Sequence, residues 1–577
     1  MNIFRRYFRL GIIIPILLLA AGAGAAAPAS TLEYTSYGAG RVVSGSLHLV
    51  DFDGDLLILD AGQFFAGDGE GAPDFPAEQL GRIPAIILSH IHIDHSGRIL
   101  ELVKKGFRGK IYCSLPTREL MPVMLGMSAR QSDLGRERFH YSRDSHRRNR
   151  RQGKSTSVHI HPECRWGEQI KSRAGISCSR NELEDRGFYL CRTCAELEID
   201  EILEMVEVVW PGRSYRITPR LTADFFQTPH LPGSLMARIS NPVTGSSLLY
   251  TGDMGSGFSP FLAGQEQVDR ATWAIIEGTY TPVEREIDPR EAFRKFVGEK
   301  VREGKRVIIP SFVLDRAQQV IHDISLGIKE GHIPEGQKVK VFSPSIEEIN
   351  RIYAEEFRQP RFATFFADNY RREGPFDDIW VVPARGDDDV GYGEIASCSS
   401  GMADAGHAKE FVKRWVGDPR TVFVFVGYQA PNTVGGRLTR LGRTEELVLR
   451  DGTVLSGVVE QENVAAVLLR TETGRRTVPR ANIARQQPGT ATITIDGRPY
   501  PVRAEVRNMS SFSGHARPDQ IRDFLAEIEG LKDVLIVHAD PHVIHLLGAY
   551  YRRELPDINF HIPRMGEPLT LGSDLRK

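Results

Sequence analysis

The segment from Ser89 to Gly97, with the sequence SHIHIDHSG, constrains the fold of this chain more than any other. It follows the apolar run 85–88, which is typical of a buried strand. Strand ends of this kind lie at the carboxyl edge of a sheet, where α/β proteins place their active sites. Neighbouring side chains on one short turn point in different directions, so this segment is able to serve two metal ions. Its potential metal ligands are His90, His92, Asp94 and His95.

The length and charge of the chain limit what it can be. Its 577 residues exceed what one hydrophobic core usually holds, so we expect two or three folding units. The 73 Lys and Arg residues are balanced by 74 Asp and Glu residues. Any nucleic-acid site must therefore be a local basic patch, and net charge alone identifies no partner.

Residues 1–29 resemble a targeting segment, in which three arginines precede an apolar run at 10–19 and a tract of small residues. We therefore expect a signal peptide and an exported protein, periplasmic or extracellular. The paired arginines of RRYFRL also resemble a twin-arginine signal. An uncleaved membrane anchor is the alternative, because the apolar stretch approaches the length that spans a bilayer. A misassigned start codon would instead leave the protein in the cytoplasm.

Other strand-like segments also end in an acid or a histidine. The strand predicted at 55–59 ends in Asp60, which would hold the ligand turn in place or simply initiate a turn of its own. Later strand patterns end near His230, Asp253 and Glu277. Repeated strand ends with metal-ligand side chains predict one site assembled from all of them.

Residues 131–197 differ in composition from their surroundings, and we interpret them as an insertion. The stretch 136–154 contains eight Arg or Lys residues with aromatic residues and histidines between them. This composition suits phosphate contact and base stacking. A solvated basic loop would have the same composition, so both interpretations stay open.

Four of the six cysteines follow within the same insertion: Cys164, Cys178, Cys191 and Cys194. His159 and His161 lie just ahead of them. The CxxC spacing of Cys191 and Cys194 allows two thiolates to bind one tetrahedral ion. We predict a structural zinc site formed by the four cysteines. Disulfides are the alternative, and export would favour them.

Residues 283–440 contain short apolar runs that alternate with amphipathic helical patterns, which predicts a second, parallel sheet. HIHIDH resembles the HxHxDH signature of the metallo-β-lactamase superfamily. The phrases PSFVLDRAQQ, SSGM and VGYQAPNTVGGRL resemble the β-CASP family within it, to which ribonuclease J and the pre-messenger-RNA three-prime endonuclease belong. The resemblance covers most of residues 35–565.

This resemblance implies a mixed α/β architecture. Residues 30–282 would form an αββα metallo-β-lactamase sandwich, into which residues 283–440 insert a parallel α/β β-CASP domain. Residues 495–577 would return to the first domain. Between them, the strand patterns and Gly-centred turns of residues 446–487 predict a small β-barrel of the Sm or SH3 type, which binds RNA, a peptide or nothing.

The returning segment carries two further histidines. His515 lies in SSFSGHA and His538 begins HAD. These phrases resemble the two histidine motifs that β-CASP enzymes add to the common fold. In that family the second histidine is present in the members that cut RNA, whereas the DNA-cutting branch has an apolar residue there. His538 therefore indicates RNA.

Matched position by position, the resemblance implies a centre of two Zn²⁺ ions, with Mn²⁺ as the alternative. The implied ligands are His90, His92 and His230 for one ion, Asp94, His95 and His538 for the other, and Asp253 as the bridge.

The resemblance also implies the roles of other residues. His515 is the expected general acid for the departing oxygen, and Glu277 would orient and charge it. Asp94 is catalytic as well, through the metal that it holds. Ser399 and Ser400 are expected to contact the substrate phosphate.

The predicted function is a two-zinc phosphodiesterase that hydrolyses single-stranded RNA and leaves a five-prime phosphate. A DNA or non-specific nuclease of the same family is the nearest alternative. A catalytically silent RNA-binding protein and a small-ester metallo-hydrolase are two others. No small-molecule cofactor is expected, a homodimer stays open, and membrane contact is expected only through the N-terminal segment.

Overall fold

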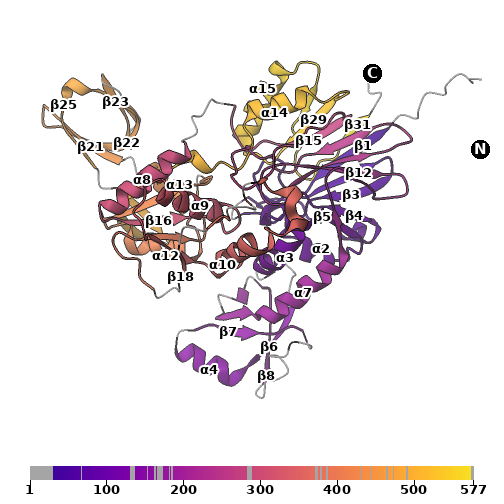
Figure 1. Cartoon of the computed structure of the whole chain (residues 1–577), viewed down its shortest axis with the longest axis horizontal. Helices are drawn as coiled ribbons and strands as arrows, with labels where there is room; N and C mark the ends of the chain where they lie inside the picture. Colours follow the sequence, from indigo (N-terminus) through magenta and orange to yellow (C-terminus); the bar gives the residue numbers. More distant parts are fainter. Residues whose placement is uncertain are drawn as a thin grey trace, which may run out of the picture.

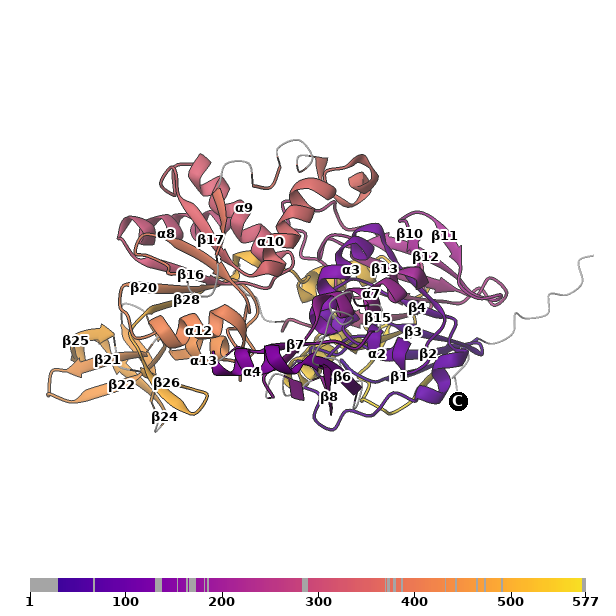
Figure 2. The same cartoon turned by 90° about the horizontal axis from the view of Figure 1, so that it is seen from below.

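The structure is a computed structural model that describes residues 30–572, apart from short internal gaps. Figures 1 and 2 show two central sheets on one side and a third sheet, with its own helices, on the other. The gaps are residues 66–67, 130–136, 153, 162–163, 165–172, 181, 184–185, 283–288, 369, 371–373, 377–379, 385–387, 431, 442–443, 463–464, 472–473 and 489–490.

The first central sheet has seven strands. In chain order they are β1 (Thr31–Ser36), β2 (His48–Phe52), β3 (Asp55–Leu59), β4 (Ala85–Ile87), β5 (Lys110–Ser114), β10 (Val206–Val209) and β31 (Leu569–Gly572). Their order across the sheet is β10-β5-β4-β3-β2-β1-β31. Because β31 pairs with β1, the last described strand lies beside the first.

The second central sheet also has seven strands. They are β11 (Ser214–Arg216), β12 (Thr222–Gln227), β13 (Leu235–Ser240), β14 (Ser247–Tyr250), β15 (Trp273–Glu277), β29 (Asp533–Val537) and β30 (Asn559–His561), and they pair in that order. The last four run parallel, so their carboxyl ends meet at one edge. β15 and β29 are neighbours, although the inserted domain separates them in the sequence.

The two central sheets pack face to face around a shared core. Phe52 of β2 and Trp273 of β15, both fully buried, meet edge to face with ring centroids 5.7 Å apart. Helices α14 (Pro518–Ala526) and α15 (Pro541–Glu554) bury apolar side chains on the outer face of the second sheet. Helices α2 (Ile99–Lys104) and α3 (Leu115–Ser128) join the core of the first sheet. The mixed α/β architecture expected from the sequence is confirmed.

The inserted domain contains a third sheet of six strands, all parallel. Its order is β18-β17-β19-β16-β20-β28, and helices cover both faces. The strands are β16 (Arg306–Pro310), β17 (Lys338–Phe342), β18 (Trp380–Pro383), β19 (Ile395–Cys398), β20 (Thr421–Phe425) and β28 (Glu505–Asn508). The helices are α8 (Arg290–Arg302), α9 (Arg316–Lys329), α10 (Pro344–Arg351), α12 (Gly406–Trp415) and α13 (Val434–Leu441).

Alternation along β16 explains why both faces of this sheet need helices. Val307 and Ile309 point to one face and pack with α8 and α9, whereas Ile308 points to the other and packs with α12 and α13. A strand that is apolar on both sides is stable only when both sides are covered.

The return to the first domain begins later than expected. The sequence placed it at residue 495, but β28 pairs in parallel with β20 and completes the third sheet. The hairpin of β26 (Ala491–Ile495) and β27 (Arg498–Val502) also packs into the core of the inserted domain. A short apolar strand does not reveal which sheet it joins, so the sequence alone could not place this boundary.

Residues 444–488 form a separate antiparallel sheet at the outer end of the inserted domain (Figures 1 and 2). Its strands are β21 (Thr444–Leu449), β22 (Val454–Glu462), β23 (Ala466–Thr471), β24 (Gly474–Pro479) and β25 (Ile483–Pro488). Their order is β24-β23-β22-β21-β25, and no described residues pair β24 with β25. The closed barrel expected at 446–487 is therefore not found, and the described strands form an open sheet.

Residues 137–205 form a small module beside the first sheet (Figure 1). Its elements are β6 (Glu137–Ser142), α4 (Arg143–Arg151), β7 (Thr156–Val158), β8 (Arg173–Cys178), β9 (Phe188–Leu190) and α7 (Arg192–Met205). β6 pairs with β8, and β7 pairs with β9. α7 packs against α2 and α3 and leads directly into β10, so it joins the module to the sandwich.

Arg180 connects several elements of this module through hydrogen bonds. Its buried guanidinium donates to both carboxylate oxygens of Glu137, at 2.6 and 3.0 Å, and to both of Glu198, at 2.9 and 2.8 Å. It also donates to the backbone oxygen of Ala129 at 2.7 Å. One side chain thus links the end of α3, the strand β6 and the helix α7.

Replacing Arg180 should loosen the module. In the variant Arg180→Leu the buried Glu198 carboxylate loses the guanidinium that donates to both of its oxygens and keeps the more distant Lys104, at 3.7 Å. Removal of one member of a buried ion pair costs about 3–5 kcal/mol. We expect faster proteolysis within residues 137–205 of the full chain. The matched control is Arg192→Leu, because Arg192 is 72% exposed and pairs with Glu196 on the surface of one helix. Equal proteolysis of the two variants would contradict this role of Arg180.

None of the helices in the described part of the chain combines the length and the hydropathy needed to cross a membrane. Residues 1–29, where the sequence predicted a signal peptide or an anchor, lie outside the described residues.

Candidate active site

The predicted metal ligands lie where strands of the two central sheets end at a common edge. His90 and His92 lie on the turn after β4, and helix α1 (Ile93–Ser96) carries Asp94 and His95. The remaining residues lie at or just after other strands: Asp60 after β3, His230 after β12, Asp253 after β14, Glu277 at the end of β15 and His538 after β29.

Asp60 holds the ligand turn in position through four hydrogen bonds. Its carboxylate accepts from the backbone amide of Ser89 at 2.7 Å and from the Ser89 hydroxyl at 2.6 Å. It also accepts from the Tyr250 hydroxyl and from Nδ1 of His95, both at 2.6 Å. With a proton on Nδ1, where Asp60 accepts it, His95 would offer Nε2 as a ligand atom to a metal.

The backbone at two of these strand ends is unusual. Asp60 and His538 have φ values of 56° and 55°, in the left-handed region that non-glycine residues seldom adopt. Such conformations persist where the surrounding structure enforces them, and they are common at functional sites. Here they turn a side chain from the end of a strand into the site.

His90, His92, His230 and Asp253 form the first group of possible metal ligands, with one donor atom of each within 4.8 Å of the others. Nδ1 of His92 lies 3.2 Å from Nε2 of His90 and 3.2 Å from Nε2 of His230. Burial lowers the pKa of His92 to about 4 and lowers the pKa of the other two histidines well below the usual value. The imidazoles are therefore neutral, which is the form that binds a metal.

Asp94, His95 and His538 form the second group. Nε2 of His538 lies 3.5 Å from Asp94, and Nε2 of His95 lies 3.3 Å from Asp253. Asp253 also lies 3.7 Å from His90 of the first group, so its carboxylate is shared between the two groups.

The donor set of these two groups fits divalent metal ions. It consists of imidazole nitrogens and carboxylate oxygens, which suit Zn²⁺ and also accept Mn²⁺. Within the described residues, Oδ1 of Asp253 is buried and makes no hydrogen bond. A buried carboxylate oxygen without a donor is costly unless a cation compensates it.

His515 and Glu277 form a pair at the edge of the metal-ligand groups. Nδ1 of His515 lies 2.9 Å from Glu277, and the Thr279 hydroxyl and the Met254 amide also donate to Glu277, at 2.5 and 2.7 Å. Burial alone would lower the pKa of His515, but the carboxylates of Glu277 and Asp253 outweigh it and raise this pKa. The sequence predicted this pair, and the structure brings its members together.

A cavity of about 950 Å³ opens over these groups, between the sandwich and the inserted domain. His92, Asp94, Asp253, His515 and His538 lie on its wall. The inserted domain therefore covers the predicted metal ligands and encloses the space where a substrate would reach them.

Arg316 is a cavity residue to which the sequence analysis gave no role. It begins α9, is 9% exposed, and its Nη1 makes no hydrogen bond within the described residues. A Cβ atom at Gly514 would collide with Nη2 of Arg316, so the glycine beside His515 lets this guanidinium stay in its present position. The phrase PSFVLDRAQQ contains Arg316 and was the signal that could have identified it.

Ser399 and Ser400, predicted to contact substrate, are not among the residues that line this cavity. The Ser400 hydroxyl accepts from the backbone amides of Asp404 and Ala405, at 3.2 and 3.3 Å, and so stabilises its own turn. Met402 of the same turn lies on the cavity wall instead.

The cysteine-rich segment differs from the prediction in one ligand. Cys164, Cys191 and Cys194 lie together with His159, whereas Cys178 is not part of this group. Cys178 ends β8, where it pairs with Glu137 of β6. The pairing of β6 with β8 holds Cys178 in that ladder, so His159 takes the fourth place that the sequence gave to Cys178.

The basic stretch predicted at 136–154 includes helix α4, which buries none of its side chains. None of its described residues lines the cavity. The structure therefore leaves both interpretations of this stretch open, an RNA contact and a solvated basic surface.

Several proteins resemble this chain over most of its length. Ribonuclease TTHA0252 of Thermus thermophilus is 24% identical over 90% of this chain and 95% of its own length. Endoribonuclease YSH1 of Gibberella zeae is 23% identical over 89% of this chain, which spans 54% of that relative. Transcription termination factor FttA of Methanothermobacter thermautotrophicus is 23% identical over 90% of this chain and 69% of its own length.

These relatives contradict the expected export. They are named as ribonucleases, endoribonucleases and a transcription termination factor, activities that belong where RNA is made and processed. The expectation of a signal peptide or a membrane anchor depended on the composition of residues 1–29 alone. The comparison contradicts the exported or membrane-anchored location that was predicted from that segment, and this prediction of the location was wrong.

Three family models match successive parts of the chain. The Metallo-beta-lactamase superfamily matches residues 40–163, the Beta-Casp domain matches residues 317–438, and the Zn-dependent metallo-hydrolase RNA specificity domain matches residues 499–563. Their order follows the sandwich, the inserted domain and the return. The chain therefore belongs to the metallo-β-lactamase superfamily of metal-dependent hydrolases and, within it, to the β-CASP family.

Proposed function

We propose that this protein is a ribonuclease that binds two Zn²⁺ ions and cuts single-stranded RNA, leaving a five-prime phosphate. The observation that carries the proposal is the shared carboxylate of Asp253, which lies between two groups of metal ligands and beside the His515–Glu277 pair. The sharing of one carboxylate favours two ions held close together. Mn²⁺ is the alternative occupant, because the donor atoms are nitrogen and oxygen only.

RNA is the substrate that the comparisons support. The matched RNA specificity domain, residues 499–563, contains both His515 and His538. His538 is 3% exposed and lies on the cavity wall. A phosphodiester must enter deeply to reach it, which a flexible single strand does more readily than a duplex.

The residues of the site would have the following roles. His90, His92 and His230 would hold one ion, Asp94, His95 and His538 the other, and Asp253 would bridge them. When bound, the ions would supply acidification of a water molecule and neutralisation of charge on the phosphoryl oxygens. Asp60 would keep His95 in the tautomer that ligand binding requires.

His515 would donate the proton that the departing three-prime oxygen needs. Nδ1 of His515 faces Glu277, so Nε2 is free to carry a proton toward the cavity. In the cleavage step the oxygen of a water molecule would bond to phosphorus and release one proton to solvent. The P–O bond to the three-prime oxygen would break, and that oxygen would take the proton of Nε2. Glu277 favours the protonated imidazole that this step consumes.

Arg316 would bind a phosphate of the RNA beside His515. Arg316 lines the cavity, and its guanidinium is only loosely paired with Asp315, 3.7 Å from Nη1, so its positive charge is suited to a phosphate oxygen. It would orient the substrate so that its scissile bond lies against the metal ligands.

Substitution of Asp94 and of His515 should abolish RNA cleavage for different reasons. Asp94→Ala should lose both metal and activity, because it removes a ligand. His515→Ala should keep two ions per chain and cleave about 10²–10⁴-fold more slowly, which is the usual contribution of a general acid. The measurement is cleavage of matched end-labelled single-stranded RNA and DNA, together with metal analysis of each protein.

The control for these variants is His545→Ala, since His545 is an exposed histidine outside the cavity lining. It should cleave like the wild type. Equal cleavage of RNA and DNA would favour the non-specific nuclease. If the wild type held two ions and cut neither polymer, the ribonuclease proposal would fail.

Arg316→Met should weaken catalysis without removing metal. Loss of one charged hydrogen bond to substrate costs about 1.5–3 kcal/mol, so kcat/KM for RNA should fall about ten- to a hundredfold. Arg302→Met is the matched control, because Arg302 is an exposed arginine of α8 that does not line the cavity. Unchanged kcat/KM in Arg316→Met would exclude Arg316 from substrate binding.

A further inference from the structure

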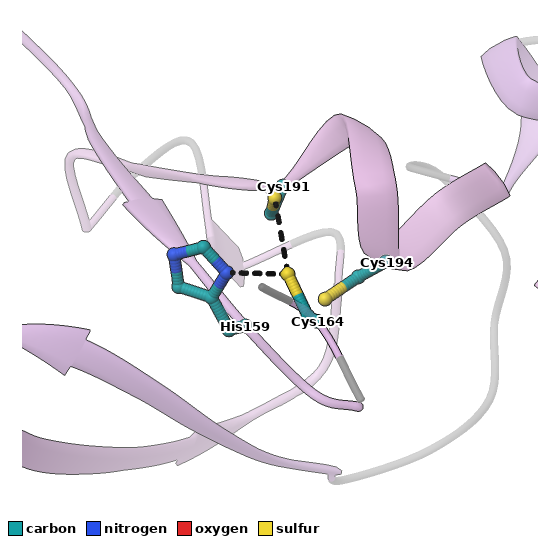
Figure 3. Close-up of side chains that lie close together, drawn as sticks. All are labelled: His159, Cys164, Cys191 and Cys194. Atoms are coloured by element: carbon teal, nitrogen blue, oxygen red, sulfur yellow. Dashed lines mark hydrogen bonds between the residues drawn. The ribbon is translucent and has the colours of Figure 1, made fainter. Parts of the chain in front are cut away.

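A second group of metal-binding side chains lies in the module of residues 137–205, apart from the candidate active site. Figure 3 shows His159 and three cysteines that point toward one another from separate parts of the chain. One donor atom of each lies within 4.8 Å of the others. Sγ of Cys164 lies 3.3 Å from Nδ1 of His159 and 3.8 Å from Sγ of Cys191. The fourth member is Cys194.

All four side chains are buried, with exposed fractions of 8% for His159, 0% for Cys164, 5% for Cys191 and 0% for Cys194. Three sulfur atoms and one imidazole nitrogen are a usual donor set for tetrahedral Zn²⁺ in a closed, structural site. No carboxylate belongs to the group. The softness of its donors distinguishes this group from the nitrogen and oxygen donors around Asp253.

The backbone around the cysteines suits thiolates. Cys191 is the N-cap of the 14-residue helix α7, and Cys194 lies in its first turn. The positive end of a helix dipole stabilises a thiolate there. The backbone amide of Ile160 also donates to Sγ of Cys194 at 3.4 Å, so the segment after β7 approaches the sulfur as well.

Neither a disulfide nor a purely apolar role for the cysteines accounts for the whole group. A disulfide requires two sulfur atoms about 2.05 Å apart. It would not explain why a third cysteine and an imidazole lie in the same group. Three buried thiols could also pack as small apolar residues. Apolar packing does not require a histidine to place its ring nitrogen against one of the sulfur atoms, whereas metal binding does.

We propose that His159, Cys164, Cys191 and Cys194 bind a structural Zn²⁺ ion that joins strand β7 to the start of α7. The site shares no residue with the candidate active site, so it does not depend on the proposed ribonuclease function. Its role would be mechanical. Cys191 already donates from its backbone amide to Val158 of β7 at 2.8 Å, and the ion would fix the same junction through side chains.

An ion that holds β7 in place would also stabilise the position of the basic helix α4, which contacts β7. His146 of α4 lies 3.2 Å from the Thr156 hydroxyl of β7, and its ring stacks on Phe188 of β9 with centroids 4.5 Å apart. Loss of the ion would therefore release β7, β9 and α4 together. The inserted domain and the outer face of the second sheet have cores that contain no residue of the module, so they would stay folded.

The first test is the absorption spectrum of the full-length protein loaded with Co²⁺ in place of zinc. Thiolate ligands give an intense charge-transfer band in the near ultraviolet, and none of the possible metal ligands in the candidate active site is a cysteine. We expect the band in the wild type. Its absence from wild-type protein that carries cobalt would overturn the proposal, whatever the fate of any variant.

Variants then assign the ligands. Cys191→Ser should lose the band and contain about one Zn²⁺ fewer per chain than the wild type. Cys178→Ser is the matched control, because Cys178 is a buried cysteine of the same module outside the group, and it should keep both. His159→Cys should retain the zinc, since four thiolates also form a structural site.

Two results would count against the site. Equal zinc content and equal cobalt spectra in Cys191→Ser and the wild type would exclude these cysteines as ligands. A wild-type mass lower by two hydrogens, in protein prepared without reductant, would identify a disulfide instead. The ribonuclease proposal is tested by RNA cleavage, so failure of one proposal is distinguishable from failure of the other.

Discussion

The carboxylate of Asp253 is the group on which the rest of the site depends. It is 2% exposed, and histidine nitrogens from five different positions lie 3.3 to 3.8 Å from its oxygens. Burial of a charge is costly unless opposite charge compensates it. Burial lowers the pKa of His90 and His230, whereas nearby carboxylates outweigh burial and raise the pKa of His95 and His515, so these two imidazoles supply part of the positive charge. This donor set fits divalent cations, which would compensate the buried charge of Asp253. The stability of the fold and the chemistry of the site would then depend on the same interaction.

The path of the chain connects this site to the inserted domain. Glu277 is the last residue of β15 before the insertion, and His515 follows shortly after β28, the last strand of the inserted sheet. The segment that leads to His515 packs on the inserted domain, since Phe512 contacts Phe293 of α8 with ring centroids 4.8 Å apart. The two members of the acid pair therefore lie at the two junctions between the domains. The packing of the inserted domain on the sandwich therefore determines both the orientation of the His515 ring and the position of the Arg316 guanidinium.

Local patterns in the sequence identified the parts of the site that are local in structure. His90 to His95 lie on one turn, where residue type alone indicated metal ligands. The complete ligand set, with His230, Asp253 and His538, came from the resemblance to the β-CASP family. What the sequence missed depends on contacts between distant segments. Cys178 was replaced by His159 because β6 pairs with β8, Ser399 and Ser400 lie outside the cavity lining, and β28 joins the inserted sheet. For Cys178 and β28 the decisive information is which strand pairs with which, and spacing along the chain does not encode it.

The two proposed metal sites follow opposite physical requirements. The ligands around Asp253 are nitrogen and oxygen atoms at the wall of a cavity, so an ion there would keep positions open for water and substrate. The ligands around Cys164 are mostly sulfur, buried, and sufficient in number to close a tetrahedron. A closed site of soft donors leaves no position for a reactant. It also needs all four of its ligands. The chain thus separates reactivity from mechanical support by donor type and exposure, and for this reason the module of residues 137–205 is able to hold an ion without competing for the substrate.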